Sequence, residues 1–184
     1  MRAIFSPFGR NAHAHKFHYT PYLPAVRAFV NLLQNFVGRK AMELTMMRNA
    51  EQTIGNLIDK QKTAFIASVD GEGFPNMKAM LSPRKRNGLR EIWFSTNTSS
   101  MRVAQYRKNP KASVYFMDSR FFRGVLLVGT MEVLEDSAIK EEIWKFGDKM
   151  YYPKGVTDPD YCVLKFTAKS GRYYSNFKSE DFTV

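Results

Sequence analysis

The chain has 184 residues, of which 44% are hydrophobic and 24% charged, a composition typical of a soluble globular protein with one main domain. Its single cysteine, Cys162, excludes an intramolecular disulfide and favours the reducing cytoplasm, and no Cys/His cluster is present to hold zinc. No run of about eighteen apolar residues occurs, so we expect no membrane span and no membrane partner.

The net charge of +11 at pH 7 is unevenly distributed along the chain. Residues 1–41 contain six Lys or Arg and no acid, which leaves 22 basic and 17 acidic residues elsewhere, a net charge of +5. This mildly basic body leads us to expect no nucleic-acid partner, and the rival hypothesis of such a partner predicts strongly salt-dependent binding. The basic residues between 84 and 90 are interpreted as a solvated hairpin tip. All three histidines lie at positions 13–18, which excludes a Ser-His-Asp triad from the body.

Residues 1–41 form an extension that differs in composition from the body. Residues 22–37 have apolar residues at helical spacing, with Pro24 in the first turn and Gly38 at the predicted C-terminal stop. The apolar positions are Val26, Phe29, Val30, Leu33, Phe36 and Val37. Three interpretations stay open: a helix added to the domain, an organellar targeting segment, or an upstream extension that is not natively made. We favour the third, with residues 42–184 as the folded domain.

The first half of the body is predicted to be a helix followed by three strands and a short helix. The first helix has Leu44, Met47, Ile54, Leu57 and Ile58 on one face. The predicted order is helix 43–60, strand 63–69, a glycine turn at 70–73, strand 75–81, a basic turn at 83–89, strand 90–95 and helix 100–108. Asn109 and Pro110 end the short helix.

The second half is predicted to contain four strands and one helix. Gly124 and Gly129 lie inside the second of these strands and suggest bends or bulges where a barrel curves. The predicted order is strand 111–117, strand 121–134, a helix from Asp136 or Ser137 to Lys149, a loop at 151–161, and strands 161–167 and 172–177 joined through Ser170-Gly171. Separate strands and helices in this order favour an α+β domain with an antiparallel barrel and peripheral helices.

An anion site is one interpretation of the segment between residues 75 and 110. Lys78 lies in an otherwise apolar strand, and six small polar residues, Ser95 to Ser100, precede a helix with Arg102 in its first turn. A helix start offers free backbone N–H groups, and the two basic side chains add full charge, so the group suits a phosphate. An ordinary N-cap with several capping residues is the more common meaning of the local pattern.

A family resemblance favours the phosphate interpretation. The segment WFSTNTSSMRVAQYRKNPKASVYF, preceded by DGEGFPNMKAM and followed by GVLLVGTMEVL, resembles the pyridoxamine 5′-phosphate oxidase-like superfamily, and within it the small general stress proteins of bacteria. The resemblance covers roughly residues 43–176. It implies an antiparallel split β-barrel that binds FMN, as a homodimer with the flavin at the subunit interface.

The same resemblance implies which residues hold the flavin. One strand would line it, and the polar segment with the helix start would enclose its phosphate and ribityl chain. The implied residues are Lys78, Ala79, Met80, Leu81, Ser95, Thr96, Asn97, Ser100, Met101 and Arg102. Two positions differ from the oxidases: Met101-Arg102 replaces a pair of basic residues, and Gly124 stands where they have a glutamine. No segment after Tyr161 resembles their C-terminal substrate-binding segment, so we expect no true pyridoxamine 5′-phosphate oxidase.

The function implied is that of a cytoplasmic flavoprotein, an FMN-dependent oxidoreductase of unknown substrate with a nicotinamide as an electron donor. In such a protein the flavin carries the redox chemistry, and the chain anchors and tunes it. Two alternatives stay open: a flavin-storing stress protein without turnover, and a split barrel that uses another cofactor such as deazaflavin. Haem is disfavoured because the body has no histidine.

Overall fold

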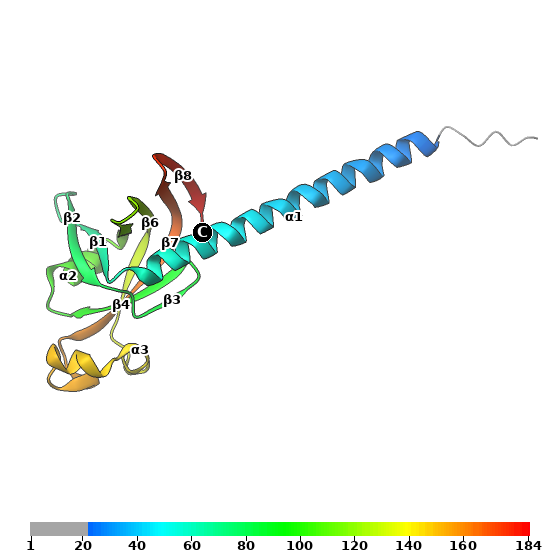
Figure 1. The fold of residues 1–184 in the computed structure, drawn as a ribbon. Helices are drawn as coiled ribbons and strands as arrows, with labels where there is room; N and C mark the ends of the chain where they lie inside the picture. The colour runs from blue at the N-terminus through cyan, green and yellow to red at the C-terminus, as the bar shows by residue number, and fades with distance from the viewer. Residues whose placement is uncertain (1–21) are drawn as a thin grey trace, which may run out of the picture. The chain divides into compact units, whose positions relative to one another are not determined.

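The computed structural model describes residues 22–184, with side chains for residues 26–42 and 50–184 (Figure 1). It divides into two compact units, Met1–Thr45 and Met46–Val184. Helix α1, Tyr22–Lys60, contributes its first part to one unit and its last part to the other. No helix in the described residues is long and apolar enough to cross a bilayer.

The predicted helix stop at Gly38 is wrong, because α1 continues through this residue to Lys60. A glycine inside a helix costs only about 1 kcal/mol relative to alanine, and good helix formers, Arg39, Lys40, Ala41 and Met42, follow it at once. No proline follows to enforce a break. The predicted apolar face of helix 43–60 is confirmed at Ile54, Leu57 and Ile58, which are buried. The side chains of Leu44 and Met47 lie outside the described residues.

The second unit is an antiparallel sheet of eight strands, as a split barrel requires. The strands are β1 Thr63–Val69, β2 Pro75–Leu81, β3 Lys85–Asn87, β4 Glu91–Asn97, β5 Lys111–Asp118, β6 Arg123–Leu134, β7 Tyr161–Ser175 and β8 Lys178–Thr183. Their order is β2-β1-β5-β6-β7-β4-β3, with β8 also paired to β7. The α+β class and the antiparallel barrel predicted from the sequence are confirmed. Strand β2 is therefore an edge strand (Figure 1).

The main core lies on one face of the sheet, and a smaller buried cluster with Trp93 and Val163 packs against α3 on the other face of β4 and β7. Alternate residues of β1 and β5, such as the register partners Ile66 and Val114, are fully buried, while Phe65, the neighbour of Ile66 along β1, is exposed on the other face. Helix α2, Met101–Lys108, packs against β1 and β6 and contributes Val103 and Tyr106 to the core. The bulge predicted at Gly129 is confirmed by a register shift between Val128 and Gly129, whereas Gly124 lies in regular register.

Two predicted elements in the last third of the chain are wrong. Residues 161–175 form the single strand β7, and the turn expected at Ser170-Gly171 lies instead at Asn176-Phe177, where both residues have positive φ. A side chain at position 171 would clash, because Phe182 of β8 and the Leu126 carbonyl oxygen of β6 lie within 3 Å of the point where a Cβ would stand. Helix α3, Ser137–Ile143, ends six residues before the predicted Lys149 and is followed by 3-10 turns at Phe146–Met150 and Gly155–Thr157.

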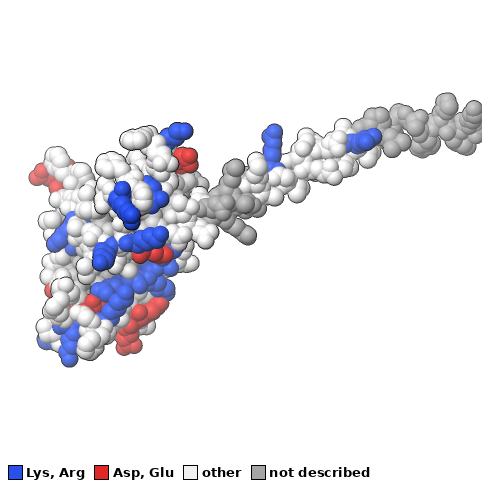
Figure 2. Space-filling view, in the orientation of Figure 1, with Lys and Arg blue, Asp and Glu red and all other residues white. Residues whose placement is uncertain are grey.

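The basic turn is a structural network rather than a solvated tip. Its middle forms β3, which pairs with β4, and each of its first three basic residues has an acidic partner. The pairs are Arg84–Asp148, Lys85–Glu142 and Arg86–Asp59. The visible face of the second unit accordingly shows basic and acidic residues intermixed rather than a basic stripe (Figure 2). This distribution gives no support to the nucleic-acid hypothesis.

Candidate functional site

Arg102 is the most unusual charged residue of the predicted site. Its side chain begins in the first turn of α2, and only 9% of the residue is exposed. One guanidinium nitrogen, Nη2, donates to Thr96 Oγ1 and to Met80 Sδ, each at 3.4 Å. Its Nε has no hydrogen-bond partner among the residues that the structure describes. Burial lowers the pKa of this guanidinium, and the neighbouring Tyr106 opposes that shift.

Within the part of the chain that the structure describes, this buried guanidinium is held by a hydroxyl and a thioether and has no carboxylate to balance its charge. These two weak acceptors engage only Nη2, and the buried Nε is left without a partner among the described residues. A guanidinium binds phosphate, as it binds carboxylate, through two parallel charge-assisted hydrogen bonds. The site of Arg102 therefore fits a phosphate-bearing cofactor, and the orphaned Nε is the observation that indicates it.

Strand β2 brings two further predicted residues to the same side. Alternation along the strand places Lys78 and Met80 on one face, and Met80 contacts Arg102. Lys78 is exposed, as expected for a lysine on an edge strand, and lies opposite Ile66 of β1. The side chains of Ala79 and Leu81 belong to the opposite face of β2. Only the backbone of these two residues is therefore placed to line a ligand beside Arg102.

Half of the polar segment Ser95 to Ser100 belongs to a strand rather than to a loop. Strand β4 continues through Ser95 and Thr96 to Asn97, and only residues 98–100 form the turn. Ser100 is the N-cap of α2, and its side chain accepts from the Val103 N–H at 3.4 Å. The ordinary capping role is thus confirmed for Ser100. It leaves the N–H groups of Met101 and Arg102, in the first helical turn, without acceptors inside the helix.

Asp160 is a functional neighbour that the sequence analysis missed. Its carboxylate accepts from the Asn97 amide and from the Ser99 N–H, both at 2.8 Å, and its carbonyl accepts from the Thr98 N–H at 2.9 Å. The hydrogen bond from Asn97 is the largest cause of the lowered pKa of Asp160. Asn97 therefore positions the turn rather than facing a ligand. No local signal could identify Asp160, since 63 residues separate it from Asn97.

Ser95 is also engaged elsewhere. Its hydroxyl accepts from Arg84 Nε at 3.0 Å, and Arg84 in turn pairs with the buried Asp148. Of the ten predicted residues, the structure thus brings Met80, Thr96 and Arg102 into contact and places Lys78 on the face of Met80. Met101 is 63% exposed at the helix start. The candidate site therefore joins the buried Arg102 to exposed residues of the edge strand β2 and of the helix start.

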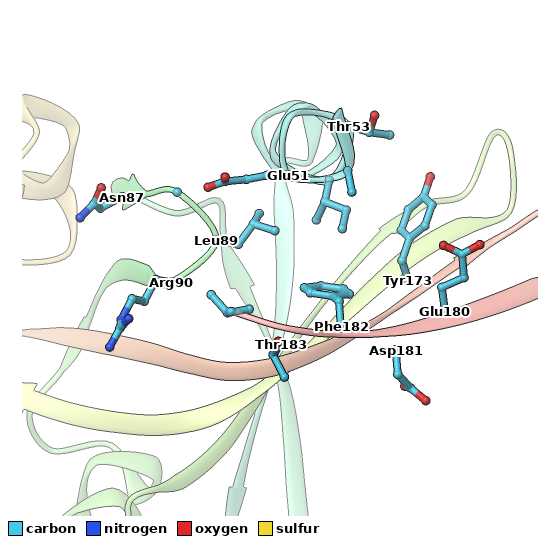
Figure 3. A pocket seen from close by; sticks show the side chains of 14 residues that line it. Glu51, Thr53, Asn87, Leu89, Arg90, Tyr173, Glu180, Asp181, Phe182 and Thr183 are labelled. Carbon is cyan, nitrogen blue, oxygen red and sulfur yellow. The ribbon is translucent and has the colours of Figure 1, made fainter. Parts of the chain in front are cut away.

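A large cavity lies elsewhere in the second unit and is shown in Figure 3. It has a volume of about 640 Å³ between α1, the turn at residues 87–90 and β8. Leu89 and Phe182 give it an apolar wall, while Glu51 and Glu180 add negative charge against the single cation Arg90 (Figure 3). None of the ten predicted residues lines it. Its charge disfavours a phosphate, so size alone does not make it the cofactor site.

Comparison with known families gives one match, to the family described as pyridoxamine 5′-phosphate oxidase like, over residues 49–183. That range includes all ten predicted site residues and Asp160. No curated protein matches the chain.

Solved structures resemble the second unit. A protein of Clostridium acetobutylicum, related to general stress protein 26 of Bacillus subtilis and described as of the pyridoxinephosphate oxidase family, is 41% identical. The alignment covers 73% of this chain and 94% of that one, with a TM-score of 0.68. General stress protein 26 from Bacillus anthracis is 18% identical over 73% of this chain and 98% of its own, with a TM-score of 0.62. A general stress protein 26 described from Jannaschia sp. is 20% identical over 75% and 99%, also at 0.62. The last two likenesses concern the fold alone.

Proposed function

The chain belongs to the pyridoxamine 5′-phosphate oxidase-like family, and from this premise we propose that it is an FMN-binding flavoprotein with Arg102 as its phosphate anchor. The observation that carries the proposal is the buried guanidinium of Arg102, which has an unsatisfied Nε and no carboxylate partner in the described part of the chain. Lys78 supplies a second, exposed positive charge from β2. FMN, when bound, supplies redox chemistry.

The chain's own residues would bind and orient the cofactor. Arg102 and the first-turn N–H groups of α2 would hold the phosphate, and Thr96 keeps the guanidinium in place. Asp160 fixes the turn that precedes the helix. We propose a flavin-dependent oxidoreductase with a nicotinamide donor. Gly124 stands where the oxidases have a glutamine, and the Tyr115 hydroxyl lies 2.3 Å from the point where a Cβ of residue 124 would stand. Tyr115 thus occupies the space of the glutamine side chain, which disfavours oxidation of pyridoxamine 5′-phosphate.

A homodimer completes the proposal, formed through the outer face of the sheet. Register places Phe65 beside Ala79 and Tyr115, Ala67 beside Met77, and Thr63 beside Leu81. This face exposes large apolar side chains of β1, β2 and β6, namely Phe65 at 37%, Met77 at 68%, Leu81 at 58% and Val128 at 45%. An apolar patch that spans several strands is the usual mark of a protein interface. Strand β2 is an edge strand with cofactor residues on one face and part of this patch on the other, and we propose that the partner reaches the flavin around this edge.

The test is a comparison of FMN with riboflavin, which lacks the phosphate. We expect the purified protein to bind FMN more tightly than riboflavin. Arg102→Ala and Lys78→Ala should each weaken FMN binding by about 1.5–3 kcal/mol, or about 10- to 150-fold. Arg102→Ala should also remove most of the preference for the phosphate. Fluorescence titration measures both affinities, and Lys169→Ala, an exposed lysine on β7, is the matched control.

Three outcomes would change the proposal. An unchanged preference for FMN in Arg102→Ala would move the phosphate site elsewhere. Binding of FMN without bleaching of the flavin by reduced nicotinamides under anaerobic conditions would favour flavin storage over turnover. Uptake of a deazaflavin in place of FMN would keep the phosphate anchor and replace the cofactor.

A further inference from the structure

The first part of α1 exposes a continuous apolar face. Between Val26 and Val37 the large apolar side chains are 43–67% exposed, and at 3.6 residues per turn they fall on one side of the helix. The positions on this side are Val26, Phe29, Val30, Leu32, Leu33, Phe36 and Val37. Two aromatic rings, Phe29 and Phe36, lie about one turn before and one turn after Leu33 and give the face its largest contact area. Such a face is stable only when an apolar phase covers it.

The opposite side of the same helix is polar and carries only positive charge. Arg27, Asn31, Gln34, Asn35 and Arg39 lie there. Lys40 lies on the apolar side, at its C-terminal end, and its Nζ stands 5.9 Å from the centre of the Phe36 ring, so that its long stem can follow the apolar surface. The first acidic residue of the chain is Glu43. Figure 2 shows basic but no acidic residues along the described stretch of α1 before its grey segment.

This charge pattern selects among the surfaces that could cover the face. Two copies of the helix packed through this face, in either direction, would gain no ion pair, since residues 26–42 contain Arg27, Arg39 and Lys40 but no acid. The headgroups of an anionic bilayer instead neutralise these charges, and its acyl chains receive the side chains of Phe29 and Phe36. A helix with Lys and Arg on its polar side and Phe and Leu on the other matches the water–lipid boundary of an anionic bilayer.

We propose that residues 22–42 form an interfacial helix that binds anionic lipid, lying in the headgroup layer with its apolar side toward the acyl chains. The sequence alone led us to expect no membrane partner, and the uncovered face is the reason to infer one. The inference is independent of flavin binding, because its residues belong to the first unit and those of the cofactor site to the second.

The test uses the full chain and two kinds of vesicle, phosphatidylcholine alone and a mixture with about one third phosphatidylglycerol. Flotation should show binding to the anionic vesicles at least about tenfold tighter than to the neutral ones, and higher salt should weaken it. The double variant Phe29→Ser/Phe36→Ser should reduce binding to anionic vesicles by at least about tenfold. The double variant Asn31→Ser/Asn35→Ser, on the polar side, is the control and should bind as the wild type does.

Several results would overturn the inference. Equal binding of both kinds of vesicle, no binding of either, or equal losses in the two double variants would each contradict it. Assembly beyond a dimer that Phe29→Ser/Phe36→Ser abolishes, without vesicle binding, would show that another copy covers the face. FMN titration of the same variant separates this proposal from the cofactor site, since its affinity for FMN should be unchanged.

Discussion

Arg84 and Asp148 form an ion pair that is almost fully withdrawn from water. The Arg84 side chain is 12% exposed and that of Asp148 3%. Each partner makes a further hydrogen bond, from Arg84 Nε to Ser95 Oγ at 3.0 Å and from the Lys145 N–H to Asp148 at 3.0 Å. The pair thus joins the turn before β3 to the 3-10 turn after α3. Removal of one partner would leave a buried charge without compensation.

We therefore expect Asp148→Ala to lower the free energy of unfolding by about 3–5 kcal/mol, measured by chemical denaturation. Glu142→Ala is the matched control, because Glu142 pairs with Lys85 on the surface, where the two side chains are 50% and 44% exposed. Exposed pairs contribute only about 0–1 kcal/mol. Similar losses in the two variants would show that water reaches Asp148.

At the scale of elements, the pairing of β6 with β7 depends on the bulge at Gly129. A Cβ at this residue would stand 2.0 Å from the carbonyl oxygen of Thr167, a backbone atom that cannot move aside without breaking the ladder. We expect Gly129→Ala to destabilise the protein by about 1–3 kcal/mol or more, measured by thermal unfolding. Gly147→Ala is the control, since a Cβ at Gly147 would meet nothing within 4 Å. An equally stable Gly129→Ala protein would mean that the bulge can relocate.

Features that depend on residues close together in the sequence were predicted well, and features that depend on contacts between distant residues were predicted poorly. Helix α2 was predicted almost to the residue, because its cap Ser100 and its stop at Asn109 act within a few positions. The division of β7 at Ser170-Gly171 was wrong, because Gly171 serves a close approach of β8 rather than a turn. Arg102 was predicted as part of the site, yet its burial was not, and the bond between Asp160 and Asn97 depends wholly on the fold.

For the whole molecule, several carboxylates have a pKa below the usual value. The largest cause of the lowered pKa is in each case a side-chain hydrogen bond to the carboxylate. Arg86 donates it to Asp59, Asn97 to Asp160 and Arg172 to Asp181. The pKa values of Asp70, Glu91 and Asp118 are lowered as well. A carboxylate with a depressed pKa in the folded state contributes stability above its unfolded pKa, about 4, and this contribution is lost as the pH falls through the folded value.

We expect the free energy of unfolding to change little between about pH 5 and 8 and to decline steadily below about pH 4. Urea denaturation at a series of pH values measures this. Asp160→Asn removes one of the titrating groups and should make the acid decline shallower. An unfolding free energy that stays constant down to about pH 3 would show that these hydrogen bonds do not persist in solution.

The proposed dimer interface can be tested with a charge on the outer face of β2. Met77 is 68% exposed on the outer face of β2, on the side opposite Lys78, so a charge there disturbs a partner but not the residues beside Arg102. The wild type should sediment at twice the 21.3 kDa chain mass, and Met77→Asp should weaken the dimer by at least about tenfold, because an unpaired carboxylate would be buried. Met150→Asp alters a 76% exposed methionine outside this face and should leave the dimer intact.

If the flavin lies at the interface, Met77→Asp should also bind FMN more weakly than Met150→Asp does. A dimer of Met77→Asp as stable as the wild type would place the interface on another surface, and a stable monomer with full FMN affinity would show that one chain holds the whole site.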